Sequence, residues 1–368
     1  MRNIIIGNGV NIQFDGWDYT NRRIVERALF KLKTRDYSKK IYTEEIEVWI
    51  KMLFQAFPNF LKGAYDKLAV LKDEKEELAN FKKRYTKKTR IYEIGFEDFF
   101  LLNELFCRKN KIGNPERNDF QEFLRRLFLD SIYNNGKINQ IYENFNENFI
   151  AFLKSYDNIF TTNYDRNIEL ATKREVLYLH GAFHVLDNVY DPNSFRNQLS
   201  DRPCEKTPVI KGYEHVFSTA LTGSSGAFKQ HVAESLELAN SGIKKFSEGM
   251  KNKPEIRREI AKWKDSDNDI IRNLYEAIQL KSQNPDLKFS IDYTLNKLNE
   301  IEGVITLIGL SPNNDSHILS IILNNKQIDL IEFYYYEESE KKDISSYFHD
   351  KRIEILNVTE FWNRITSP

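Results

Sequence analysis

Residues 4–11 are Ile4-Ile5-Ile6-Gly7-Asn8-Gly9-Val10-Asn11, an apolar run that ends in a glycine turn. Three consecutive β-branched residues predict a strand that is buried on both faces, as in a parallel sheet between helices. Glycines directly after such a strand let backbone amides approach a phosphate-bearing ligand. The standard dinucleotide motif has a third glycine where this chain has Ile12, so a tight turn without a ligand stays open as an alternative.

Similar runs recur along the chain and predict the rest of a sheet. Each is short, rich in β-branched residues and followed by a polar or glycine-bearing turn. They lie at residues 3–6, 158–162, 176–179, 208–210, 304–308, 328–333 and 353–356. We therefore expect an α/β fold with a Rossmann-like parallel sheet.

Two long segments between these runs have apolar residues at helical spacing instead. In the first segment, one helical face carries Ile46, Trp49, Ile50, Leu53 and Phe54. The predicted organisation is a discontinuous α/β core of residues 1–19, 150–228 and 301–368, interrupted by helical insertions at 20–149 and 229–300.

The composition restricts the class of protein. The 368 residues carry 54 lysines and arginines and 54 aspartates and glutamates, so no net charge attracts nucleic acid or an anionic membrane. Cys107 and Cys204 are the only cysteines and lack the spacing of a zinc ribbon or a disulfide framework, so no metal is expected. The apolar run at the N-terminus is too short for a signal peptide or a membrane span. We expect a soluble, cytoplasmic protein.

One strongly basic segment, residues 81–90, stands out against this neutral background. It includes Lys82, Lys83 and Arg84, with aromatic residues interleaved. Such a segment is either a solvated helix end or a docking surface, and the sequence leaves both readings open.

Polar residues follow two of the predicted strands. Residues 161–165 are Thr161-Thr162-Asn163-Tyr164-Asp165, and His180 follows the run at 176–179. Asn163 and Asp165 stand two apart on a turn, so one can face a cleft while the other braces the loop through backbone amides. His180 can accept a proton near neutral pH. The structural alternatives are a simple Asx turn and a buried histidine bonded to backbone.

These elements together resemble a known family. The order Gly7-x-Gly9, Thr162-Asn163-Tyr164-Asp165, Leu179-His180-Gly181 and Ile308-Gly309-Leu310-Ser311, followed by Asp315 and His317-Ile318-Leu319, resembles the sirtuin-like NAD-hydrolysing effectors of bacterial anti-phage defence. The resemblance covers the core segments and neither helical insertion. It implies a sirtuin-like core in which Asn163 and His180 are catalytic and Asp165 supports them. The cofactor-binding residues that it implies are Gly7, Asn8, Gly9, Asn11, Thr162, Gly309, Ser311 and Asp315.

The activity that the resemblance implies is hydrolysis of NAD to nicotinamide and ADP-ribose, which depletes NAD on infection. Classical sirtuins that deacylate proteins use a four-cysteine zinc module, which two isolated cysteines cannot form. In addition, residues 12–16 replace the stretch that usually follows the glycine loop. Water is therefore the expected acceptor of the ribose.

The resemblance also implies regulation through an oligomer or a separate activator subunit, including a nucleoside-triphosphate pyrophosphatase-like nucleotide sensor. Two other functions stay open. The chain can be an NAD- or ADP-ribose-binding regulatory subunit of a defence complex. It can also be an abortive-infection protein of the AbiH type.

Overall fold

A computed structural model describes residues 1–191, 193–196, 209–223, 225–291, 293–312, 314–348 and 352–366. The chain forms two compact units. Unit 1 contains Met1–Ala182, Ala220–Lys229 and Tyr293–Pro368, and unit 2 contains Phe183–Thr219 and Gln230–Asp292. The first helical block therefore belongs to the same unit as the sheet. Part of the predicted core, Phe183–Thr219, groups instead with the second set of helices.

Unit 1 is built on a six-stranded sheet in which all neighbouring strands are parallel. The strands are β1 (Arg2–Ile6), β2 (Asn158–Thr161), β3 (Leu177–Tyr178), β4 (Gly303–Ile308), β5 (Ile328–Tyr335) and β6 (Ile353–Asn357). Their order is β3-β2-β1-β4-β5-β6, which is a doubly wound, Rossmann-like order. The predicted α/β class and parallel sheet are confirmed. The run at 208–210 is not a strand: residues 209 and 210 have no regular structure, and Pro208 lies outside the described residues.

The central strand β1 explains why the isoleucine run is so apolar. It pairs with β2 on one side, with Ile5 opposite Phe160, and with β4 on the other, with Ile5 opposite Leu307. Ile4, Ile5 and Ile6 are all 0% exposed. Because parallel crossovers are right-handed, connections that leave β1 and β4 in opposite directions place their helices on opposite faces. A crevice therefore opens between the carboxyl ends of these two strands.

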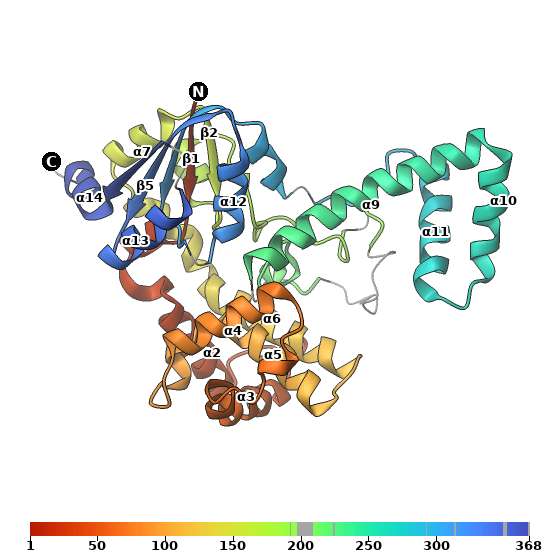
Figure 1. The fold of residues 1–368 in the computed structure, drawn as a ribbon, viewed down its shortest axis with the longest axis horizontal. Helices are drawn as coiled ribbons and strands as arrows, with labels where there is room; N and C mark the ends of the chain where they lie inside the picture. Colours follow the sequence, from red (N-terminus) through yellow and green to blue (C-terminus); the bar gives the residue numbers. More distant parts are fainter. Residues whose placement is uncertain are drawn as a thin grey trace. The chain divides into compact units, whose positions relative to one another are not determined.

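Helices cover both faces of the sheet (Figure 1). On one face, α1 (Gly9–Asp15), α7 (Glu147–Lys154) and α14 (Val358–Thr366) meet through aromatic rings. The ring of Phe14 lies 5.0 Å from that of Phe149 and 5.6 Å from that of Trp362. Figure 1 shows α12 (Ser316–Asn324) on the other side of the strands. The remaining helices of the sheet region are α8 (Asn167–Thr172) and α13 (Glu338–Tyr347).

The predicted first helical block consists of α2 (Asn21–Thr34), α3 (Glu45–Leu61), α4 (Lys72–Arg84), α5 (Asp98–Asn110) and α6 (Glu116–Tyr133). Ile46, Trp49, Ile50 and Leu53 of the predicted stripe are buried. The basic segment begins in the last turn of α4, where Lys82 pairs with Asp66 and Arg84 pairs with Asp98, and continues into the loop after the helix. Two of its charges therefore stabilise the block itself.

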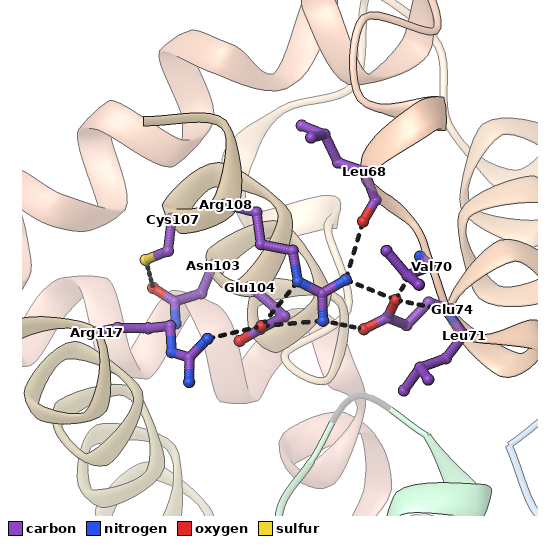
Figure 2. Close-up of polar contacts among 9 residues, drawn as sticks. All are labelled: Leu68, Val70, Leu71, Glu74, Asn103, Glu104, Cys107, Arg108 and Arg117. Carbon is purple, nitrogen blue, oxygen red and sulfur yellow. Dashed lines mark hydrogen bonds and ion pairs between the residues drawn. The ribbon is translucent and has the colours of Figure 1, made fainter. Parts of the chain in front are cut away.

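A network of ion pairs ties α4 to α5 (Figure 2). The guanidinium of Arg108 donates to both carboxylate oxygens of Glu74, at 2.7 and 2.6 Å, and to the backbone carbonyl of Leu68 at 2.9 Å. Glu104 accepts from Arg108 at 3.1 Å and from Arg117 of α6 at 3.3 Å. Against the effect of burial, Arg108 and two backbone amides lower the pKa of Glu74. The bidentate pair is the strongest geometry for such a contact.

Cys107 lies beside this network in α5. Its side chain is buried, and burial raises the pKa of its thiol to about 11. A thiol with so high a pKa is a poor nucleophile at neutral pH. Cys204 lies outside the described residues.

Unit 2 contains most of α9 (Gly226–Asn252), together with α10 (Pro254–Lys262) and α11 (Asp269–Gln283). Its core is a small cluster of Phe195, Ile243, Ala277 and Phe289. Among the described helices of the whole chain, none has the length and apolar character needed to cross a membrane.

Candidate functional site

A cavity of about 600 Å³ lies in unit 1 at the carboxyl ends of the central strands. Its wall includes ten of the residues predicted for the site: Asn8, Gly9, Asn11, Thr162, Asn163, Asp165, His180, Gly309, Ser311 and Asp315. Gly7 is absent from the wall and packs against Gly309. The structure therefore brings together residues that are more than 300 positions apart in the sequence.

The glycine turns after β1 and β4 pack directly against each other. A Cβ atom on Gly7 would lie 2.2 Å from the carbonyl oxygen of Gly309, and one on Gly9 would lie 2.7 Å from the Cα of Gly309. The amides of Gly7 and Gly9 donate to the carbonyls of Ile308 and Gly309, at 2.8 and 3.2 Å. The sequence predicts that the glycines let backbone amides approach a phosphate. The amides of Gly7 and Gly9 themselves hold the two turns together, and this close backbone approach requires glycine.

Asp165 braces the loop after β2. Its Oδ2 accepts a hydrogen bond from the side-chain amide of Asn11 at 2.7 Å, and its Oδ1 accepts from the backbone amide of Asn167 at 3.0 Å. Burial raises the pKa of Asp165, and these hydrogen bonds act in the opposite direction. Since both oxygens are engaged, Asp165 acts on a ligand mainly by fixing Asn11 and the loop.

Asn163 is the member of the pair whose side chain has a free acceptor. Its backbone amide donates to Oγ1 of Thr161 at 3.0 Å, and its Nδ2 donates to the carbonyl of Gly7 at 3.3 Å. The carbonyl partner fixes the orientation of the side-chain amide, because only the NH₂ group can donate. Within the described part of the chain no donor reaches Oδ1, which remains able to accept a hydrogen bond from a ligand or a water.

His180 forms a buried pair with His317 of α12. Their Nε2 atoms are 2.9 Å apart, and the two residues are 2% and 4% exposed. Burial, Lys229 and His317 together place the pKa of His180 well below its ordinary value. Burial and Lys229 also lower the pKa of His317 to about 3. Both rings are therefore neutral at pH 7, contrary to the prediction that His180 accepts a proton near neutral pH.

A buried ion pair completes the wall. Lys229, at the start of α9, lies 2.7 Å from a carboxylate oxygen of Glu97, just before α5. Although burial opposes the charge of Lys229, Glu97, Tyr164 and Asp315 raise its pKa, so the ammonium stays charged. Neither residue carried a sequence signal, because both lie in helical segments far from the strand ends.

Asp315 is the acidic group of the cavity with a pKa near neutrality. Burial raises the pKa of Asp315 to about 6, partly offset by the backbone amide of Ser311 and by Lys229. The Ser311 amide donates to Oδ2 of Asp315 at 2.9 Å. A carboxyl group with this pKa can exchange protons with a ligand or a water at physiological pH.

Aromatic rings also contribute to the wall. Trp17 and Tyr336 are 68% and 63% exposed, whereas Trp362 is only 7% exposed. An exposed aromatic ring beside a cavity offers a surface on which a planar heterocycle can stack.

The volume of the cavity lies within the range of small-molecule sites. Its polar groups include several side-chain amides, a neutral imidazole, the ammonium of Lys229 and the carboxyl groups of Glu97, Asp165, Asp315 and Glu340, a set that can hydrogen bond to a polyhydroxylated ligand. Among the described residues, no group of three or more His, Cys, Asp or Glu side chains is placed to hold a metal ion.

Comparisons of the chain with protein-family models, with curated proteins and with solved structures find no match. Any proposal of function therefore depends on the geometry and chemistry of the cavity and on the sequence motifs at its edge.

Proposed function

We propose that the cavity binds NAD and hydrolyses the bond between nicotinamide and ribose, releasing nicotinamide and ADP-ribose. The observation that carries the proposal is the position of the cavity. It lies where the strand order reverses between β1 and β4, the point at which open α/β sheets bind nucleotides. Asn163, His180 and Asp315, from separate segments of the chain, meet there.

The residues of the wall suit this reaction. When the bond from C1′ to the pyridinium nitrogen breaks, its electron pair stays on nitrogen and nicotinamide leaves neutral, so no acid is required. Water then adds to C1′ and gives up a proton. The free Oδ1 of Asn163 can orient this water, and Asp315, with a pKa of about 6, can accept the proton. Neutral His180 can hydrogen bond to a hydroxyl group of the ribose.

Other parts of the dinucleotide also have suitable partners. Lys229 supplies a buried positive charge to the wall, which favours the pyrophosphate. Trp17 offers an exposed ring for the adenine.

On the sequence resemblance, we further propose that the protein is a sirtuin-like effector of anti-phage defence whose activity is controlled by an oligomer, an activator subunit or a nucleotide.

The test is to incubate the purified full-length protein separately with NAD, ADP and RNA and to quantify the products by chromatography. We expect release of nicotinamide from NAD, and loss of that release in Asn163→Ala. Asn148→Ala, at an exposed position of α7, is the matched control and should retain activity. Consumption of RNA or ADP with NAD untouched would support the AbiH-type alternative and overturn the proposal.

One observation favours a second function. His180, which lines the cavity, and its partner His317 are both weak bases, as expected of a site that binds a ligand without transforming it. A regulatory subunit would bind NAD or ADP-ribose, measured by calorimetry, and leave it chemically unchanged. Binding of NAD without release of nicotinamide would therefore support this function, and no binding would exclude both.

A further inference from the structure

The structure indicates which of the two rings, His180 or His317, donates the hydrogen bond between them. Both rings are neutral, so each carries one N–H, and only one of the two Nε2 atoms can donate across the 2.9 Å contact. The donor is decided by the other nitrogen of each ring. If His317 accepts at Nε2, its proton is on Nδ1. If His317 donates from Nε2, its Nδ1 is unprotonated and carries a lone pair.

The surroundings of His317 favour a bare Nδ1. This atom is buried and has no hydrogen-bond partner among the described residues. The first residue of α9, Gly226, packs against it. A Cβ atom on Gly226 would lie 2.1 Å from Nδ1 and 2.9 Å from both Cγ and Cε1 of the ring. In the glycine a Cα hydrogen occupies that direction, so it points at Nδ1.

A Cα–H group is a weak hydrogen-bond donor and cannot accept. If Nδ1 of His317 were protonated, its N–H would point at a Cα hydrogen of Gly226 and would have no acceptor. An unsatisfied buried donor of this kind is destabilising. A lone pair on Nδ1 meets a weakly positive hydrogen instead.

We infer that His317 is a positioning residue that donates from Nε2 to Nε2 of His180 and so holds His180 in the Nδ1–H tautomer. His180 lines the cavity, and its Nδ1 has no partner in the described part of the chain. His180 therefore presents a hydrogen-bond donor to the ligand and is unable to act as a base there. For NAD, and only if the proposed function holds, the acceptor would be an oxygen of the ribose.

Nuclear magnetic resonance can test the tautomer without any substrate. Long-range proton–nitrogen spectra of protein labelled with ¹⁵N-histidine distinguish Nδ1–H from Nε2–H rings, and His180→Gln and His317→Gln assign the two rings among the six histidines. We expect Nδ1–H for His180 and Nε2–H for His317 in the wild type. The reverse assignment, or a charged ring at pH 7, would overturn the inference whether or not NAD is a substrate.

Two sets of variants test the positioning role. His317→Gln keeps a donor and should leave His180 in the Nδ1–H tautomer, whereas His317→Glu replaces the donor with an acceptor and should convert His180 to the Nε2–H form. Gly226→Ala should displace the ring of His317 and change the His180 spectrum. Its control is Gly242→Ala, in the same helix, where an added Cβ meets no atom within 4 Å. An unchanged His180 spectrum in His317→Glu would refute the role. If that variant does not fold, the wild-type spectrum still decides the tautomer.

Discussion

The buried pair of Lys229 and Glu97 gives the sharpest prediction about stability. The Lys229 side chain is 5% exposed and that of Glu97 is 24% exposed, with 2.7 Å between the charged atoms. Glu97→Gln would leave an ammonium buried without its counter-ion. Breaking a buried pair in this way costs about 3–5 kcal/mol, and partial solvent access to Glu97 places the expected loss near the lower end, about 3 kcal/mol.

The double variant Glu97→Gln with Lys229→Met distinguishes the penalty of an unpaired buried ammonium from the net stabilisation that the ion pair provides. Methionine fills a similar volume without a charge, so we expect the double variant to lie within about 1 kcal/mol of the wild type. Glu47→Gln is the control, because Glu47 pairs with Lys51 on the exposed face of α3. Glu47→Gln should lower the free energy of unfolding by less than about 0.5 kcal/mol.

The assay is unfolding in urea followed by tryptophan fluorescence, in a Trp263→Phe background. The remaining tryptophans, Trp17, Trp49 and Trp362, all lie in unit 1, so the signal reports on the unit that contains the pair. A loss below about 1 kcal/mol in Glu97→Gln, or a double variant as unstable as the sum of the single ones, would refute the reasoning.

Three other predictions follow from the same unit. Gly9→Ala should lower the free energy of unfolding by about 1–3 kcal/mol in the urea assay, because its Cβ would lie 2.7 Å from a backbone atom of Gly309. Gly113→Ala, with no atom within 4 Å of the added Cβ, should be nearly neutral. Arg108→Met should lower the free energy of unfolding by about 2 kcal/mol, because it leaves the buried carboxylate of Glu74 without its partner. Arg22→Met, at an exposed pair with Glu26, should lower it by less than about 0.5 kcal/mol. Equal losses in the two variants would contradict this account. Asp315 has a raised pKa of about 6, so the folded state holds its proton more tightly than the unfolded state. The contribution of Asp315 to the free energy of unfolding is therefore present below about pH 4 and is lost as the pH rises to about 6. Across this range Asp315→Asn should gain about 3 kcal/mol relative to the wild type in urea titrations, and a constant difference would show that the pKa is not raised.

Six strands were predictable, and only the run at 208–210 was wrong, because burial on both faces demands continuous β-branched runs. Ile4, Ile5 and Ile6 need no context to indicate such a strand, and the observed ends of β1, β4 and β6 lie within one residue of the predictions. The grouping of the helices was not predictable. Apolar spacing shows that a segment is helical and amphipathic, but not which apolar surface it will cover.

The same distinction applies to the cavity. Asn163 and His180 follow strands, and the carboxyl ends of parallel strands meet at one edge, so their proximity could be inferred from their positions alone. Lys229 and Glu97 reach the cavity from helical segments, and only the packed structure shows that they do so. His317 stood within a recognised motif, yet its contact with His180 depends on the exact placement of α12.

The pairing of β1 also affects when the cavity can exist. A ribosome makes β1 first, but its neighbours arrive much later: Ile4 pairs with Ile159 on one side and with Thr306 on the other. The turn at Gly309 and the ring of His317 come later still. A nascent chain therefore has no complete cavity until it has been translated beyond His317, so shorter chains carry the glycine turn and Asn163 without the finished site.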